Sequence, residues 1–500
     1  MDSREPSVLP TPHHADDAPV AGLSRRSVVA GLAGSVAVVA AGQPAWAADA
    51  RRPGSARAAS LRPADRKVVG GIRPAQALRH LRGLSEDIGP RIGGTGSEYA
   101  AAQYIAGELD RHRLAVRLEP FPVADKFLAQ VDDPAGQLAD DICWQAGASP
   151  DAGLDVRVSG PAVDVGSAAA PVWPAAGVTG AVVLADDAQN ATDPVARVNQ
   201  RAAFVADAQG RGAVAVVLLP ADQAFPRRAQ AASLRLVPTT GTTPPPPTPV
   251  ATVPVIGVAQ VQKRLLREEL AVRALPLQVS TTAHRNLTSH NVIAERPSGR
   301  RGLSPLVYIG AHYDSVIGAP GANDDGSGTA LTLELARVFK SLGSTTAGVR
   351  FALWGSEEQG LIGSRYHVAQ LPQVERDRIR GAFNNDMVGT SWAPATRYWL
   401  LSFDGQANAT TQTVAAAATR LGYAPQTSPV TERGASDHQS FQEVGIASAN
   451  FSWRGEASPA LLEPPYHSPE DTIAKNISID RLTVSMELIG CAAYDLASRR

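Results

Sequence analysis

The segment at residues 306–314, LVYIGAHYD, decides the fold class. Its apolar run Leu306–Ala311 predicts a buried strand, and a Gly-rich loop then leads to a helix expected over 329–342. A second strand at Val349–Trp354 and a helix from Gly360 continue the alternation. Strands that alternate with helices are typical of parallel sheets. We therefore expect an α/β fold with a mixed, largely parallel twisted sheet flanked by helices.

The residues upstream predict a first part of the same domain. Residues 74–123 read as a helix, a Gly-rich loop at Gly89–Gly94, a second helix and a strand. The strand is expected at Leu114–Glu119, and Pro120 and Pro122 are expected to end it.

Between these two parts the texture of the sequence changes. Short apolar runs separated by Gly, Pro and Asp predict strands. The runs are Ala181–Leu184, Ala213–Leu219 and Val253–Val258. Phe204–Gln209 predicts a short helix, and the Pro run at 244–247 predicts a loop. No cluster of His and acidic residues has metal-ligand spacing here, so we expect a β-rich inserted module over 129–286.

Composition excludes several classes of protein. The chain has 500 residues, is 44% hydrophobic and 19% charged, and carries a net charge of -1, which suits two or three globular domains. The chain has no excess of basic residues, so we do not expect nucleic acid as a partner. The only cysteines are Cys143 and Cys491, so a disulfide scaffold and a multi-cysteine zinc site are excluded, and we expect both to be unpaired.

The N-terminal residues predict an export signal. The pair Arg25-Arg26 precedes an apolar stretch from Val28 to about Ala41, and Ala45-Trp46-Ala47 is typical of a cleavage site. This pattern resembles the twin-arginine signal, so we expect residues 1–47 to be removed and the protein to be secreted. The competing interpretation, a membrane anchor, would need about 18 apolar residues. Residues 48–69 predict a flexible lead-in, and we expect no stable membrane anchor.

Five places in the last 200 residues combine His, Asp and Glu, three of them just beyond expected strands. They are Gly310–Asp314, Asn323–Gly326, Gly355–Glu358, Asn384–Asp386 and Pro465–Pro469. Because ligands bind outside the carboxyl ends of strands in open α/β sheets, these residues are expected to converge. Two histidines and several carboxylates suit zinc, and a pair of metals needs a bridging carboxylate such as Asp324.

Each of these residues also has an ordinary structural interpretation. His312 could be a satisfied core histidine, and Glu357-Glu358 a helix start. Asp324-Asp325-Gly326 could be a turn. It cannot be an EF-hand loop, because the two positions that need acids carry Gly321 and Thr332. We favour a structural or supporting role for Asp437-His438.

The joint spacing of these residues resembles a known family, the secreted di-zinc aminopeptidases of the bacterial leucyl aminopeptidase and aminopeptidase Y type (metallopeptidase family twenty-eight). The residues that carry the resemblance are His312-x-Asp314, Asp324, Glu357-Glu358, Asp386 and His467, supported by Gly89-Pro90-Arg91, Asn291–Glu295 and Ser436–His438. It covers about 70–125 and 287–495.

The resemblance implies a role for each residue. His312 and Asp386 would hold one zinc ion, Glu358 and His467 a second, and Asp324 would bridge both. Glu357 would be the general base for a water activated by the two zinc ions. Asp314 would orient His312, and Tyr466 would stabilise the oxyanion. A cis peptide between Asp324 and Asp325 is also implied.

This interpretation predicts an enzyme that hydrolyses the N-terminal bond of peptides with a free N-terminus. We expect a monomer. The peptidase domain would comprise 70–128 and 287–500, and the insert at 129–286 resembles a protease-associated domain.

Three alternatives remain open. A glutamate carboxypeptidase-like exopeptidase shares the fold and metals and would need a cationic pocket for a terminal carboxylate. A glutaminyl cyclase-like transferase conflicts with the complete two-metal set. A non-catalytic binding protein on this scaffold would have lost ligands that are all present here.

Overall fold

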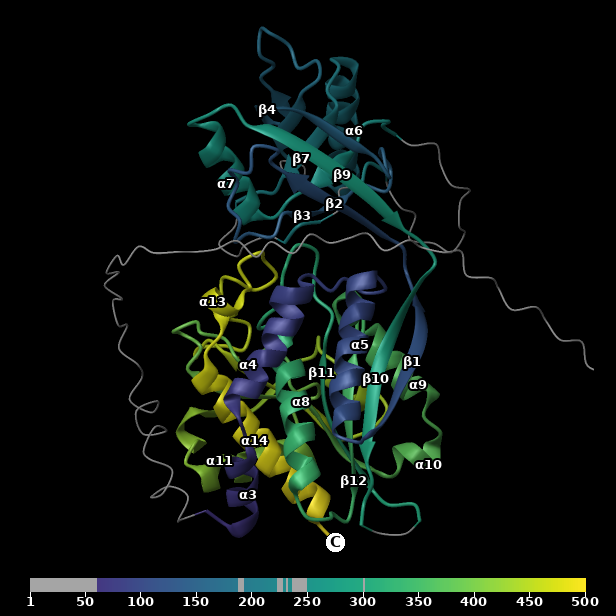
Figure 1. Cartoon of the computed structure of the whole chain (residues 1–500), viewed down its shortest axis with the longest axis vertical. Helices are drawn as coiled ribbons and strands as arrows, with labels where there is room; N and C mark the ends of the chain where they lie inside the picture. The colour runs from purple at the N-terminus through teal and green to yellow at the C-terminus, as the bar shows by residue number, and fades with distance from the viewer. Residues whose placement is uncertain (1–60, 188–192, 223–227, 231–232, 236–249, 300–301) are drawn as a thin grey trace, which may run out of the picture. The chain divides into compact units, whose positions relative to one another are not determined.

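The computed structural model describes residues 61–187, 193–222, 228–230, 233–235, 250–299 and 302–500 (Figure 1). The predicted signal at 1–47 and the Pro run at 244–247 lie outside these residues. Within the described part, the strands form two sheets.

The first sheet has eight strands and is mixed. In spatial order they are β1 (Ala115–Val123), β10 (Leu287–Arg296), β12 (Gly348–Trp354), β11 (Leu306–His312), β13 (Ile379–Asn384), β16 (Ser448–Arg454), β14 (Arg397–Ser402) and β15 (Thr427–Glu432). The central strands β12, β11, β13 and β16 run parallel to one another, and β10 and β14 run antiparallel beside them. The predicted α/β fold is confirmed.

Helices cover both faces of this sheet. One face carries α3 (Pro63–Gly71), α4 (Pro74–Arg82), α5 (Gly96–Arg111), α8 (Gly326–Ser341), α11 (Ala409–Leu421) and α14 (Ile479–Ser498). The other carries α9 (Ile362–Gln370) and α12 (His438–Gln442). The short helices α10 (Gln373–Arg376) and α13 (Ile473–Asn476) lie in connections.

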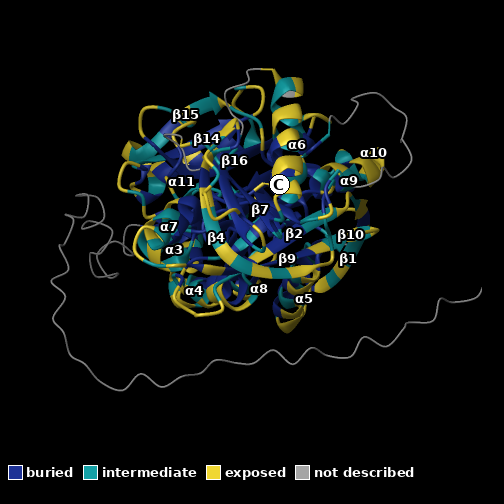
Figure 2. Ribbon diagram, turned by 90° about the horizontal axis from the view of Figure 1, so that it is seen from above, coloured by how far each residue is buried: buried dark blue, intermediate teal, exposed yellow. Residues whose placement is uncertain are grey.

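Side-chain alternation along the strands builds a core on each face. Phe351 of β12 packs against Phe339 of α8, with ring centroids 5.9 Å apart. Trp354 of the same strand packs instead against Phe441 of α12, at 5.8 Å. Positions three apart in a strand point to opposite faces, so one strand serves both layers. Figure 2 shows buried residues along the strands and exposed residues on the outer sides of the helices.

The second sheet also has eight strands. In order they are β5 (Ala170–Pro171), β4 (Arg157–Ser167), β6 (Val182–Asp186), β7 (Ala215–Leu219), β8 (Val255–Gly257), β3 (Gln145–Ala148), β2 (Lys126–Asp132) and β9 (Pro276–His284). An additional pairing of β4 with β9 closes the sheet on itself. The three strands predicted from apolar runs are confirmed as β6, β7 and β8.

The structure differs from the sequence prediction at β1. The strand runs through Pro120 and Pro122, which were expected to end it. It lies at the edge of the sheet and pairs only with β10 within it. Because the two prolines are two residues apart, their missing N–H groups lie on the same side of the strand, and an open edge tolerates their loss.

Helical structure is also more extensive than expected. The short helix predicted at Phe204–Gln209 is part of α6 (Pro194–Gly210), which Asp193 caps by accepting from the N–H groups of Val195 and Ala196. The second helix of this region is α7 (Gln260–Leu270). The predicted flexible lead-in is helical from Pro63, because α3 packs against α14.

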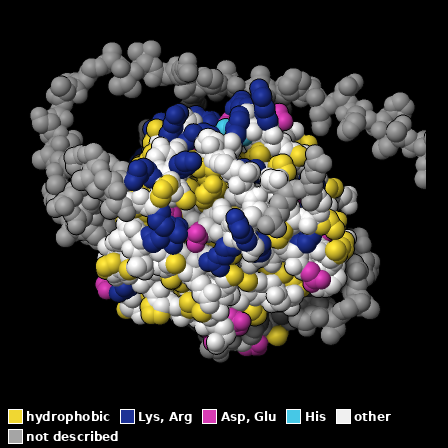
Figure 3. All heavy atoms as spheres, turned by 90° about the horizontal axis from the view of Figure 1, so that it is seen from below, with side chains coloured by type: hydrophobic (Ala, Val, Ile, Leu, Met, Phe, Trp, Pro, Cys, Tyr) yellow, Lys and Arg dark blue, Asp and Glu magenta, His cyan; other side chains and the backbone are white. Residues whose placement is uncertain are grey.

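Among the described helices none combines the length and apolar character needed to cross a bilayer. On the face shown in Figure 3, hydrophobic side chains are scattered among basic and acidic ones.

Cys143 and Cys491 are both free, as predicted.

Arg91 connects the N-terminal segment to the loop that follows β11. Its guanidinium is fully buried and donates to the carbonyl oxygens of Tyr313 (2.6 Å), Pro320 (2.6 Å) and Gly321 (2.9 Å). It also donates to the carbonyls of Leu84 and Gly89. Burial lowers the pKa of Arg91 to about 10, so the side chain remains charged at neutral pH. One cation thus fixes a loop that lacks regular structure.

We predict that Arg91→Met lowers the free energy of unfolding by about 3–5 kcal/mol, because it leaves several buried carbonyl groups without a donor. Urea unfolding followed by circular dichroism would measure the change. Arg82→Met, at an exposed position, is the matched control and should shift stability by less than about 0.5 kcal/mol. Equal effects of the two substitutions would contradict this role for Arg91.

Candidate metal centre

Three of the predicted residues lie where parallel strands end. His312 is the last residue of β11, Glu357 follows β12, and Asp386 follows β13. Strand β11 pairs in parallel with both β12 and β13, so these three ends meet at one edge of the sheet. The structure therefore brings together side chains that are up to 74 positions apart in the sequence.

Asp324 and His467 reach the same place from two loops. One oxygen of Asp324 lies 3.2 Å from Nε2 of His312, and the other lies 3.0 Å from Nε2 of His467. A single carboxylate thus faces both imidazoles, which is the arrangement that a bridging ligand requires. The peptide bond between Asp324 and Asp325 is cis, as the family resemblance implied.

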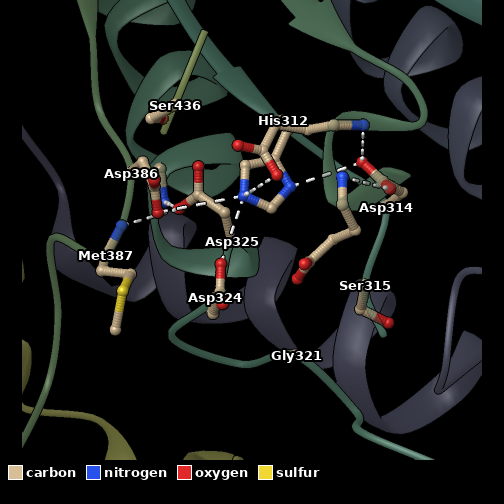
Figure 4. A network of polar contacts seen from close by, with 12 residues as sticks. His312, Asp314, Ser315, Gly321, Asp324, Asp325, Asp386, Met387 and Ser436 are labelled. Atoms are coloured by element: carbon tan, nitrogen blue, oxygen red, sulfur yellow. Dashed lines mark hydrogen bonds and ion pairs between the residues drawn. The ribbon is translucent and has the colours of Figure 1, made fainter. Parts of the chain in front are cut away.

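The ligand-type side chains form two groups. His312, Asp325 and Asp386 make up one group, and Asp324, Glu358 and His467 make up the other. Within the second, Oε1 of Glu358 lies 3.0 Å from Nε2 of His467. In the first, Oδ1 of Asp386 lies 3.8 Å from Nε2 of His312. Figure 4 shows the His312 ring between Asp386 and Asp314, with Asp324 close to it.

Two carboxylate oxygens of the first group lack a hydrogen-bond partner among the described residues. Oδ1 of Asp386 and Oδ2 of Asp325 are buried and make no hydrogen bond within the described part of the chain. A buried acceptor without a donor is costly. A divalent cation would satisfy such oxygens, and the oxygen and imidazole donors match what zinc prefers. The residues present therefore fit a metal.

Asp325 is a candidate that the sequence analysis did not consider. One of its oxygens accepts from the N–H groups of Gly328 (2.8 Å) and Met387 (3.2 Å), so it both caps α8 and holds the backbone beside Asp386. Its other oxygen faces the His312 group. The sequence analysis assigned only Asp324 as a ligand, because one bridging carboxylate is enough for a pair of metals.

Asp314 lies beside His312 and also binds the backbone. Its Oδ1 lies 3.4 Å from Nδ1 of His312, and the orienting role that the resemblance implied stays a prediction. Its two oxygens also accept from the backbone N–H groups of Glu357 (2.9 Å) and Glu358 (3.2 Å). One buried carboxylate thus lies close to a histidine of the first group and holds the turn that carries the two glutamates.

Asp471 supports the second group in a similar way, and the sequence analysis did not select it. Its carboxylate accepts from the N–H groups of Asn323 (2.9 Å) and Asp324 (3.0 Å). It lies four residues after His467, so it ties the loop of His467 to the loop of Asp324. The only sequence signal was its position in the turn after the histidine.

Backbone conformation is unusual at the same residues. Ser356, Met387 and His467 have φ angles of 54°, 66° and 55°, although none is glycine. Ser356 precedes Glu357, and Met387 follows Asp386. Left-handed conformations of non-glycine residues cost energy and tend to persist at functional sites. Glu98 holds one of them, since it accepts from the N–H of Ser356 at 2.9 Å.

The charge state of the site follows from its crowded carboxylates. Burial would lower the pKa of His467, but Glu358 and Asp324 outweigh it and raise the pKa to about 10. Burial, reinforced by Asp437, raises the pKa of Glu357 well above its usual range. A cation that binds here must therefore displace a proton from His467.

Tyr466 and Asp437 complete the surroundings. The Tyr466 ring stacks on His467, with centroids 3.7 Å apart. Burial and the carboxylates of Asp324 and Glu358 raise the pKa of Tyr466, so its hydroxyl remains a hydrogen-bond donor. Asp437 is buried and its pKa is raised to about 7 by burial, while His438 donates from Nε2 to the carbonyl of Arg433 at 2.8 Å. The supporting role expected for this pair stays a prediction.

These residues border a cavity of about 410 Å³. It is lined by His312, Asp324, Glu357, Glu358, Asp386, Met387, Tyr466 and His467, together with four arginines and other residues. One of the arginines, Arg228, comes from the segment between β7 and β8 and lies 3.7 Å from Glu358. All five predicted metal ligands therefore line this cavity. Of the three predicted catalytic residues, Glu357 and Tyr466 line it and Asp314 does not.

Comparison with known proteins identifies the family. The profile of peptidase family M28 matches residues 291–491. Aminopeptidase YwaD of Bacillus subtilis is 31% identical over 476 residues, which cover 93% of each chain. The chain belongs to peptidase family M28. It is therefore an enzyme that hydrolyses peptide bonds, and the predicted family is confirmed.

Solved structures of this peptidase family agree. The zinc aminopeptidase BSAP from Bacillus subtilis is 30% identical, and the match covers 86% of this chain and 96% of that one with a TM-score of 0.58. An aminopeptidase from Aneurinibacillus sp. strain AM-1 is 28% identical, covering 87% and 96%, with a TM-score of 0.52.

The two neighbouring aspartates can be distinguished by experiment. We predict that Asp324→Asn weakens zinc binding by more than about 100-fold, beyond the usual cost of losing a supporting residue. Asp325→Asn keeps the oxygen that accepts from Gly328 and Met387, so it should weaken binding by less than about tenfold. Zinc titration of the metal-free variants by calorimetry would measure both. Equal losses would show that Asp325 is also a ligand.

Proposed function

We propose that this peptidase is a secreted zinc aminopeptidase that removes the N-terminal residue of peptides with the help of two zinc ions. The observation that carries the proposal is the position of Asp324, whose two oxygens face two histidines from different loops. The names of the relatives support zinc and an N-terminal cleavage site.

The donors divide between two ions. His312 and Asp386 would hold one zinc ion, Glu358 and His467 the other, and Asp324 would bridge them. Bound zinc lowers the pKa of water and polarises a peptide carbonyl. Asp314 and Asp471 keep the ligands in place through hydrogen bonds to the backbone beside them.

Glu357 is the proposed general base. It lies beside Glu358 and 3.9 Å from Nε2 of His312, and it borders the cavity. Its carboxylate would take a proton from the attacking water and return it to the leaving amine. Tyr466 would donate a hydrogen bond to the oxyanion that forms on the scissile carbonyl.

Three further parts of the proposal rest on the sequence. Residues 1–47 would direct export through a twin-arginine-type signal, and the mature enzyme would act outside the cell as a monomer. The second sheet would belong to a protease-associated domain predicted at 129–286, although its strand β2 already begins at Lys126. The carboxypeptidase alternative keeps the same metals and differs only in which end of the peptide it recognises.

We predict a crossed result for the two glutamates. Glu357→Gln should keep two zinc ions per chain, measured by plasma mass spectrometry, yet lower kcat by about 10²–10⁴-fold, because it removes the base and keeps the shape. Glu358→Gln should instead lower zinc occupancy, because it removes a charged ligand. The opposite pattern would exchange the two roles.

A peptide panel tests the end that is cut. The wild-type enzyme should release the first residue of Leu-Gly-Gly and leave N-acetyl-Leu-Gly-Gly intact, with products identified by mass spectrometry. A chelator should abolish release, and added zinc should restore it. Release of the C-terminal residue from the acetylated peptide would establish the carboxypeptidase alternative.

A further inference from the structure

The four arginines that line the cavity fall into two pairs. Arg228 lies 3.7 Å from Glu358, and Arg365 lies 3.2 Å from Glu443, so each has a carboxylate partner. Arg433 and Arg454 have no carboxylate within 4.0 Å in the described part of the chain. A guanidinium removed from water without an anion loses much of its hydration energy. No carboxylate in the described part of the chain therefore offsets the desolvation of these two cations at ion-pair distance.

Arg433 follows β15 and is held by its main chain. Its N–H donates to the carbonyl of Ser402 at 2.8 Å, and its own carbonyl accepts from His438 at 2.8 Å. Its side chain is half-buried and makes no hydrogen bond within the described residues. Arg433 and Arg454 both line the cavity. Burial, with the charge of Arg454, lowers the pKa of Arg433. Hydrogen bonds to the described residues therefore hold the main chain of Arg433 and not its guanidinium group.

Arg454 ends β16 and is 4% exposed. Its hydrogen-bond partners are neutral: Oγ of Ser452 and the carbonyl of Pro459, each at 3.2 Å. Its Nη2 also lies 4.0 Å from Sδ of Met387, the residue after Asp386. This contact places a buried positive charge one residue from a proposed zinc ligand. Asp386 itself acts electrostatically on Arg433 from beyond ion-pair distance.

We propose that Arg433 and Arg454 form a subsite that binds a carboxylate group of the substrate, beside Asp386. The inference rests on the proposed peptidase function of the same cavity. A carboxylate matches the planar fork of a guanidinium and supplies the anion that both arginines lack. In a peptide it can come from an N-terminal Glu or Asp side chain or from the C-terminus of a dipeptide.

The experiment compares substrates that differ only in this charge. For the side chain, the pair is Glu-p-nitroanilide and Gln-p-nitroanilide, which have no C-terminal carboxylate. For the terminus, the pair is Leu-Leu and its amide. Wild-type enzyme should favour the carboxylate member of at least one pair by about 10–100-fold in kcat/KM, the effect of a hydrogen bond between charged groups.

Variants locate the effect. Arg433→Gln should reduce that preference to less than about threefold, and Arg433→Lys should leave an intermediate value, because it keeps the charge without the fork. Arg365→Gln, which removes a cavity arginine that already has a partner, should keep the wild-type preference. The ratio within each pair corrects for any general loss of activity or stability.

A binding measurement gives an independent readout. In calorimetry with zinc-loaded enzyme, L-glutamate should bind more tightly than L-glutamine if the side chain is recognised, and Arg433→Gln should remove the difference. If instead only Leu-Leu is favoured over its amide, the subsite binds the terminal carboxylate. Ratios near one for both pairs in wild-type enzyme would overturn the inference, as would a preference that Arg433→Gln leaves intact. Failure to cleave Leu-p-nitroanilide at all would contradict the aminopeptidase function itself.

Discussion

The centre of this protein depends on one carboxylate shared by two histidines. Asp324 lies 3.2 Å from His312 and 3.0 Å from His467, and only 6% of its surface is exposed. Such a buried charge is stable only where its position is fixed and its partners are complete. Much of the surrounding structure meets this demand. Asp471 holds the backbone of Asp324, and Arg91 holds the preceding loop through the carbonyls of Pro320 and Gly321.

The sheet provides the other half of the constraint. Because β11 pairs in parallel with both β12 and β13, their carboxyl ends present His312, the two glutamates and Asp386 along one edge. The buried Asp314 then joins two of these ends by accepting from the N–H groups of Glu357 and Glu358. Carboxylates thus serve two purposes: several face the histidines, and Asp314 and Asp471 bind backbone N–H groups. These hydrogen bonds offset part of the cost of burying acids close together.

The chain belongs to peptidase family M28, whose members hydrolyse peptide bonds. The arginines that line the cavity add positive charge to it. The predicted metal ligands and the proposed base share its lining with Arg433 and Arg454. An enzyme that acts at a chain end must recognise a charged group as well as a peptide bond. The proposed carboxylate subsite would therefore lie in the same cavity as the predicted metal ligands.

The sequence by itself determined the α/β class, the strands β11 and β12, the order of the candidate metal ligands and, through the family resemblance, the cis bond after Asp324. These features are local: apolar runs set the strands, and fixed spacings set the motif. Tertiary structure alone decided the rest. Pro120 and Pro122 remain in a strand because β1 lies at an edge, which no local pattern encodes. Asp325 and Asp471 bind backbone N–H groups of residues far away in the chain, and Arg433 has no carboxylate partner at ion-pair distance among the described residues. A side chain's residue type limits what it can bind, but burial and the neighbours that folding brings to it decide what it does bind.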